Sequence, residues 1–171
     1  MEYSLLIRKL NHTDLNLYQC GTEDCKPGHH FGPAVRNFFL IHYIHSGRGK
    51  FIVGDKEYNL HEGQGFLIVP GIVTYYQADY ETPWVYSWIG FTGIKAEGYL
   101  KCAGLTVDSP IFTCEDDYID KCFRNMIAAR DLEKSRELNI LGHLYLFLSY
   151  LIEKNNECES YEDNSTRREE Y

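Results

Sequence analysis

Apolar and polar positions alternate along the middle of the chain. From Arg36 to Phe91, short runs of β-branched and aromatic residues are separated by turns such as Gly54-Asp55 and Pro70-Gly71. This pattern is typical of an all-β sandwich or barrel whose neighbouring strands pair antiparallel through short loops. We expect strands near residues 36–46, 49–53, 57–60, 65–69, 72–78 and 84–91.

Two shorter elements follow the predicted barrel strands. Thr92–Ala103 is expected to form a short helix, because Thr92 can cap its N-terminus and Gly104 can end it. The apolar stretch Ile111–Cys114 then predicts a strand that returns to the barrel.

After Cys114 the apolar residues recur every three to four positions, which indicates two amphipathic helices. The first stripe comprises Tyr118, Ile119, Cys122, Phe123, Met126 and Ile127. The second comprises Leu138, Leu141, Leu144, Tyr145, Leu148, Leu151 and Ile152. The short polar joint at residues 130–135 predicts an antiparallel helical hairpin. Ile140 and Phe147 lie off the second stripe, and we expect this additional apolar surface to meet a partner.

These patterns predict a mostly β chain with C-terminal helices. We divide it into an arm and barrel at residues 1–114, a helical hairpin at 115–155 and a linker at 156–171, which is polar and has no period. No stretch is long and apolar enough for a membrane span, and the N-terminus lacks the order of a secretory signal. A cytoplasmic protein without membrane contact is therefore expected.

Composition narrows the function further. The chain of 171 residues carries a formal net charge of −8, which argues against binding to a nucleic-acid backbone by this chain alone. Its six cysteines are expected to be reduced in the cytosol. Cys20, Cys25, His29 and His30 can be drawn as a zinc site, but the gap between the cysteines is at the edge of the usual spacing. We favour a loop before the first long strand.

Three sequence blocks resemble the sensor domain of AraC/XylS transcription regulators. The blocks are GPAVRNFFLIHYIHSGRGKF, LHEGQGFLIVPGIVTYYQAD and PWVYSWIGFTG, and the resemblance covers roughly residues 30–155. It implies a cupin-like barrel, also called a double-stranded β-helix or jelly roll, that binds a small effector such as a sugar. It also implies that the helical pair dimerises, and that DNA is bound only through a helix-turn-helix domain absent from this chain. The run Arg167–Tyr171 resembles the segment that leads into that domain.

The candidate ligand residues come from the predicted strands. The strand period of two places Trp84, Tyr86 and Trp88 on one face. Aromatic faces with polar edges suit a sugar, although ordinary core packing explains these rings equally well. The resemblance implies that Tyr76, Tyr86 and Trp88 line the pocket and that a basic residue near Arg36 reaches the ligand.

His42 and Tyr43 are neighbours, so only one of them can face the cavity. We favour His42 as a ligand residue, and the alternative is a histidine whose hydrogen bonds are satisfied at the barrel surface. For a homodimer, the second helix offers candidates that serve both the core and the interface. They are Leu141, Leu144, Tyr145, Leu148 and Leu151.

Catalysis is not expected, because the chain lacks the relevant motifs. No His-x-His follows Gly47, and Thr74-Tyr75-Tyr76 stands where a metal-binding cupin would offer its second histidine. A G-x-S-x-G nucleophile motif and a phosphate-binding glycine loop are also absent from the sequence. We expect no catalytic residue, no metal and no cofactor. The alternatives to a regulator are a free-standing sugar-binding protein and a metal-dependent cupin enzyme.

Overall fold

The chain folds into two antiparallel sheets that face each other. The computed structural model describes residues 3–6 and 14–157, so the segment from residue 158 onward, which contains most of the predicted linker, lies outside the described residues. One sheet has the order β1 (Tyr3–Leu6), β2 (Asn16–Asp24), β9 (Val85–Thr92), β4 (Phe39–Ser46), β7 (Gln64–Ile68) and β10 (Ile111–Thr113). The other has the order β3 (His30–Val35), β8 (Val73–Ala78), β5 (Arg48–Val53) and β6 (Lys56–His61).

Strands β2 to β9 follow the path of a jelly roll. The chain passes repeatedly between the sheets, so that β2-β9-β4-β7 in one sheet faces β3-β8-β5-β6 in the other. Jelly rolls, including cupins, consist of two such four-stranded layers. The predicted fold class, a cupin-like barrel followed by helices, is therefore confirmed.

The prediction of a loop around Cys20–His30 was wrong. Residues 16–24 form β2, which pairs with β9 through partners such as Cys20 and Ile89, and β3 begins at His30. The strand predicted from residue 36 starts only at Phe39. The sequence pattern obscures β2 because some of its inward side chains, Gln19 and Glu23, are polar and line a cavity between the sheets.

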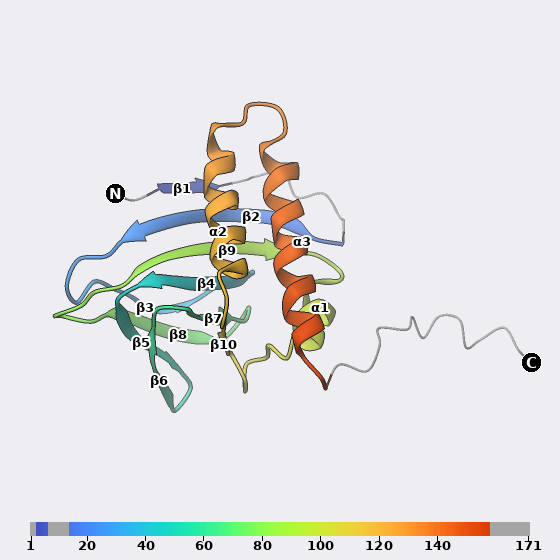
Figure 1. Cartoon of the computed structure of the whole chain (residues 1–171). Helices are drawn as coiled ribbons and strands as arrows, with labels where there is room; N and C mark the ends of the chain where they lie inside the picture. The colour runs from blue at the N-terminus through green and yellow to red at the C-terminus, as the bar shows by residue number, and fades with distance from the viewer. Residues whose placement is uncertain (1–2, 7–13, 158–171) are drawn as a thin grey trace, which may run out of the picture.

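The helices form a layer outside the six-stranded sheet. They are α1 (Ala96–Cys102), α2 (Tyr118–Ala128), the 3-10 turn η1 (Ala129–Asp131) and α3 (Arg136–Lys154). Figure 1 shows α2 and α3 side by side across the sheet, as the predicted hairpin requires. The prediction that Thr92 caps a helix was wrong, because Thr92 pairs with Asn16 as the last residue of β9 and α1 begins at Ala96.

The six-stranded sheet separates two hydrophobic cores. The inner core lies between the sheets and includes Phe51, Phe66 and Trp84. The outer core lies between the six-stranded sheet and the helices, and Ile140 and Phe147 are fully buried in it. These two residues therefore cannot meet a partner chain, contrary to the prediction. None of the described helices combines the length and apolar character needed to cross a membrane.

Candidate functional site

A cavity of about 250 Å³ lies between the two sheets. The residues lining it come from both sheets and from the segment before β4. They are Gln19, Glu23, His29, Phe31, Arg36, Leu40, His42, Tyr76, Tyr86 and Trp88. The structure therefore brings together all five side chains predicted to bind ligand, namely Arg36, His42, Tyr76, Tyr86 and Trp88.

His42 is surrounded by aromatic rings inside the cavity wall. Its imidazole stacks on Phe66 at 4.5 Å between ring centroids. Tyr76 and Tyr86 lie at 4.8 Å and 4.9 Å from it, tilted or edge-on. Trp88 follows at 6.2 Å, so the inward residues of β4, β8 and β9 form one aromatic wall. The strand period decides the orientation: His42 faces the cavity, whereas Tyr43 points outward and stacks on Phe123 of α2.

One buried polar atom in this wall has no partner. His42 is only 2% exposed, and its Nδ1 forms no hydrogen bond with any described residue. Burial, together with the nearby positive charge of Arg36, holds the pKa of His42 well below its usual value. The imidazole is therefore neutral at physiological pH, and an unpaired buried nitrogen costs about 1 to 3 kcal/mol unless something binds to it.

Arg36 provides the positive charge of the cavity. Its guanidinium lies 4.1 Å from the centre of the Phe31 ring, and none of the described carboxylates forms an ion pair with it. Burial raises the pKa of Tyr76 to about 12, and Arg36 acts against that rise. Tyr76 therefore keeps its hydroxyl proton, and Arg36 keeps donors that can reach a guest molecule.

The sequence analysis missed the polar residues Gln19, Glu23 and His29 of this cavity. The Tyr86 hydroxyl donates a hydrogen bond to Glu23 Oε2 at 3.4 Å, and Glu23 Oε1 lies 3.4 Å from His29 Nε2. The assignment of residues 20–30 to a loop concealed Glu23 and His29, and no strand was predicted around Gln19. Recognition of residues 16–24 as a strand paired with β9 would have placed Gln19 and Glu23 on its inner face.

The residues considered for a zinc site separate in the structure. Cys20 belongs to the outer core, and the ring of His30 stacks on Tyr75. Cys25 and His29 remain close, and Glu23 joins them. Burial raises the pKa of the Cys25 thiol to about 12.

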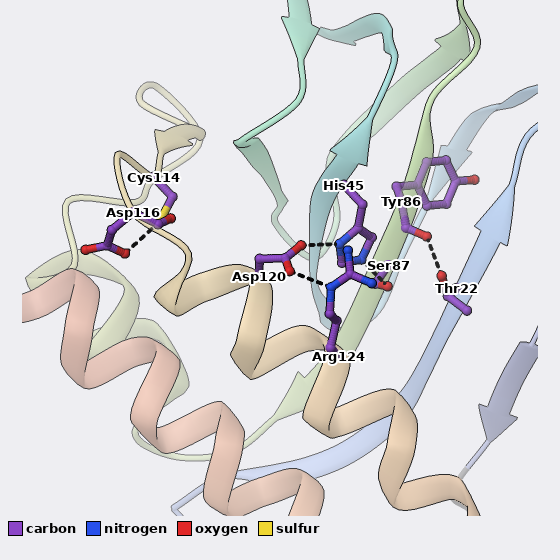
Figure 2. Close-up of polar contacts among 8 residues, drawn as sticks. All are labelled: Thr22, His45, Tyr86, Ser87, Cys114, Asp116, Asp120 and Arg124. Carbon is purple, nitrogen blue, oxygen red and sulfur yellow. Dashed lines mark hydrogen bonds and ion pairs between the residues drawn. The ribbon is translucent and has the colours of Figure 1, made fainter.

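A hydrogen-bond relay lies on the opposite face of the six-stranded sheet (Figure 2). His45 Nδ1 is 2.7 Å from Asp120 Oδ1, and His45 Nε2 is 2.7 Å from Ser87 Oγ. Burial lowers the pKa of His45, so its ring is neutral near pH 7. Because the carboxylate only accepts, Nδ1–H donates to Asp120 and the Ser87 hydroxyl donates to Nε2. Arg124 donates to the second oxygen of Asp120.

This relay connects the barrel to the helices. Ser87 of β9 lies between Tyr86 and Trp88, which face the cavity, while Asp120 and Arg124 belong to α2. A second hollow of about 570 Å³ lies beside the relay and is lined in part by His45, Ser87 and Arg124. The same strand therefore touches the cavity with one face and the helical layer with the other.

The predicted dimer residues have different exposures. Leu144, Leu148 and Leu151 are buried in the outer core of their own chain, and Leu141 packs against that core with partial exposure. Tyr145 is 41% exposed, and Leu138 and Leu146 beside it are also exposed. Of these predicted dimer residues, Tyr145 and the partly exposed Leu141 are the ones that another chain could reach, whereas the three buried leucines are not.

A family model and several related proteins were found by comparison with known proteins, and they agree with one another. A family model described as "AraC-like ligand binding domain" matches residues 16–148. The chain is 38% identical over 150 residues to the Msm operon regulatory protein of Streptococcus mutans, covering 85% of this chain and 53% of that protein. It is 36% identical over 102 residues to the raffinose operon transcriptional regulatory protein of Pediococcus pentosaceus, covering 58% of this chain and 36% of that protein.

A third relative is the lactose operon transcription activator of Staphylococcus xylosus. It is 28% identical over 145 residues, which cover 82% of this chain and 52% of that protein. The chain spans about half the length of the Streptococcus and Staphylococcus relatives. Among solved structures, the chain resembles the protein YhaK from Escherichia coli with a TM-score of 0.48 and 13% identity, over 56% of this chain and 46% of that one. A Cupin 2 conserved barrel domain protein from Salinispora arenicola gives a TM-score of 0.44 and 11% identity, and the match covers 58% of this chain and 82% of that protein.

Proposed function

This chain belongs to the family of AraC-like ligand-binding domains, and on that basis we propose that its barrel senses a small carbohydrate for a transcription regulator. The relatives are named as regulators of the Msm, raffinose and lactose operons. Since the matched region covers only about half of the Streptococcus and Staphylococcus relatives, we assign DNA binding to a part of the regulator outside this chain. The regulator would act in the cytoplasm.

The observation that carries the proposal is the unpaired Nδ1 of His42 in an aromatic cavity. Sugars combine an apolar C–H face with hydroxyls that both donate and accept hydrogen bonds. The ring of Trp88 offers a surface for the C–H face. The His42 nitrogen, the Arg36 guanidinium and the Tyr76 hydroxyl offer partners for the hydroxyls.

The size of the cavity favours one sugar ring. Its volume of about 250 Å³ equals that of roughly eight molecules of liquid water. A single pyranose ring fits such a space, whereas a second ring would extend through the mouth. Lactose and raffinose, which appear in the names of two relatives, both carry a terminal galactosyl ring. A galactoside is therefore our first choice of effector.

Binding would act through the two faces of β9. Closure of Tyr86 and Trp88 on a sugar would shift Ser87, which hydrogen-bonds to His45 and through it to α2. A ligand shifts a conformational equilibrium only by its different affinity for the two states. We propose that the two states differ in the hydrogen bonds of the relay formed by Ser87, His45 and Asp120.

We further propose that a second copy of the chain covers the exposed face of α3. Leu138, Tyr145 and Leu146 are exposed there, and Leu141 lies beside them, partly buried. The double substitution Leu138→Glu with Leu146→Glu should convert a dimer to monomers in sedimentation, because each new negative charge occurs twice in a two-fold interface. A dimer that persists would exclude this face.

A ligand screen tests the sugar proposal directly. The purified chain is heated with galactose, lactose, raffinose, glucose and ribose, and any ligand that prefers the folded state raises the melting temperature. A sugar at a hundred times its Kd should add about 2.7 kcal/mol of stability. Calorimetric titration of the best sugar should then give one site per chain. Failure of every sugar to raise the melting temperature, even at millimolar concentration, would contradict the proposal.

A further inference from the structure

Three different metal-ligand atoms converge at the edge of the cavity. A carboxylate oxygen of Glu23, the sulfur of Cys25 and a ring nitrogen of His29 all lie within 4.8 Å of one another. Glu23 Oε1 and His29 Nε2 are 3.4 Å apart. In a tetrahedral zinc site with bonds of about 2.0 to 2.3 Å, neighbouring ligand atoms are about 3.3 to 3.8 Å apart. Small side-chain movements therefore suffice to surround one ion.

The backbone holds this cluster in place. β2 ends at Asp24, and continuing its period of two by one residue puts Cys25 on the same inner side as Glu23. The Cys25 amide donates to the Trp84 carbonyl at 3.2 Å, and the His29 amide donates to the Lys26 carbonyl at 3.0 Å. The turn between them contains Gly28 with a φ of +70°, where an added Cβ would lie 2.4 Å from the Tyr80 ring. The short spacing of the three residues is thus fixed by hydrogen bonds and packing.

A fully buried donor beside Cys25 also lacks a partner. Trp84 packs with Cys25 in the inner core, and its Nε1 forms no hydrogen bond with any described residue. Trp84 is 0% exposed, so water does not compensate for this loss. A thiolate bound to a metal accepts hydrogen bonds from its surroundings. Metal binding at Cys25 would give the Trp84 N–H its missing acceptor.

We propose that Glu23, Cys25 and His29 bind one Zn²⁺ ion, whose fourth position opens toward the cavity. Sulfur and imidazole nitrogen select zinc over magnesium or calcium, which prefer oxygen. On binding, the Cys25 S–H bond is replaced by an S–Zn bond and the proton passes to solvent. The thiolate and the Glu23 carboxylate then balance the charge of the ion, and His29 binds as a neutral ring.

This site differs from those the sequence analysis considered. From the sequence, the set Cys20, Cys25, His29 and His30 was considered and a loop was preferred, so no metal was expected; Cys25 and His29 of that set remain together in the structure, and Glu23 joins them. Glu23 was not considered, because its segment was assigned to a loop. Zinc binding here does not depend on the sugar proposal, since the three ligands are present without a guest.

Cobalt is the probe of choice, because Co²⁺ bound to a thiolate absorbs in the near ultraviolet and a tetrahedral site gives strong visible bands. The chelator-treated chain is titrated with Co²⁺ in the absence of sugar. We expect both bands to saturate at one equivalent and to disappear when one equivalent of Zn²⁺ is added. A folded chain that shows no near-ultraviolet band from a bond between Co²⁺ and the thiolate would overturn the proposal.

Two matched pairs of variants assign the ligands. Cys25→Ser should abolish the near-ultraviolet band, whereas Cys20→Ser, which changes a buried thiol of the outer core, should retain it. His29→Ala should weaken Co²⁺ binding at least about tenfold. His30→Ala, the exposed neighbour, should leave it unchanged. His29 is itself exposed, so its variant should fold, and equal effects of the two histidine variants would refute the assignment.

Discussion

The inner and outer cores lie on opposite faces of the six-stranded sheet. They differ in whether their buried polar groups form hydrogen bonds. On the outer face of the sheet, Ser87, His45 and Asp120 hydrogen-bond to one another at 2.7 Å beside a hollow of about 570 Å³, and the apolar side chains of the outer core pack between sheet and helices. In the inner core, His42 Nδ1 and Trp84 Nε1 are buried and form no hydrogen bond with any residue that the structure describes, and a cavity remains. The outer core therefore mainly stabilises the fold, whereas the inner core contains unsatisfied groups that the proposed ligand would satisfy.

Strand β9 shows this contrast within consecutive residues. Tyr86 and Trp88 face the cavity, while Ser87 and Ile89 face the helices. Substitutions on the outer face should mainly change stability, and substitutions on the inner face should mainly change binding. The predictions that follow test this division.

The largest effect is expected in the outer core. Phe147 is fully buried and lies 5.5 Å from the rings of both Phe112 and Phe123. Phe147→Ala should lower the free energy of unfolding by about 3 to 5 kcal/mol, because it leaves a cavity between helix and sheet. Urea unfolding measures this loss. Ile94→Ala, at a side chain that is 77% exposed and outside α3, serves as the control, and a loss for Phe147→Ala no larger than that of the control would contradict the division.

Trp88→Ala should have the next largest effect, on binding instead of folding. Removal of the ring should lower sugar affinity at least about tenfold, which is about 1.4 kcal/mol, because the C–H face of the sugar loses its stacking surface. Calorimetric titration gives the affinity. Tyr80→Ala removes an aromatic ring that is 71% exposed and outside the cavity, and it should leave affinity unchanged. Unaltered affinity in the Trp88 variant would remove this residue from the site.

His42→Phe should change both the pH dependence of stability and the affinity for sugar. Because the pKa of His42 is lowered in the folded chain, the unfolded chain binds more protons below pH 6.5, and stability is lost as pH falls. This single group should contribute a slope of up to about 1.4 kcal/mol per pH unit. The phenylalanine variant should lose that slope in urea unfolding between about pH 5 and 6.5, and should bind sugar more weakly. A slope equal to that of the wild type would mean that His42 is not responsible.

The smallest effect is expected for the relay. Ser87→Ala removes one hydrogen bond to His45 and should cost about 1 kcal/mol of stability. If the relay couples the cores, the same variant should also weaken the effect of sugar on the helices. Hydrogen exchange of α2 with and without sugar measures that coupling. Sugar-induced protection of α2 identical to that of the wild type would restrict Ser87 to a structural role.

Much of the architecture follows from the sequence pattern, because packing surfaces leave a clear periodicity. Glycine-punctuated alternation predicted the strands from β4 to β9, and the change of period after Cys114 predicted α2 and α3. Strand β2 was missed because cavity-facing Gln19 and Glu23 interrupt the alternation that apolar packing produces. The sequence could not separate Leu144, buried in its own core, from Tyr145, exposed on α3, since both fit the same helical stripe.

The candidate site was predicted in part for the same reason. Aromatic Tyr76, Tyr86 and Trp88 fit the strand pattern and also resemble a family motif, so they were found. Glu23 and His29 depend on a contact between the end of β2 and the turn before β3, and no local pattern reveals such a contact. Polar residues that serve a cavity are the ones that sequence periodicity conceals.

Fluorescence of a single tryptophan tests the central claim most directly. The chain has two tryptophans, so Trp84→Phe leaves Trp88 as the only indole, at the wall of the cavity. Titration with the sugar that most raises the melting temperature should change its emission in a saturable manner, with the Kd found by calorimetry. The reciprocal Trp88→Phe variant should respond weakly. Calorimetric binding without any change in Trp88 emission would place the sugar outside the barrel and contradict the account.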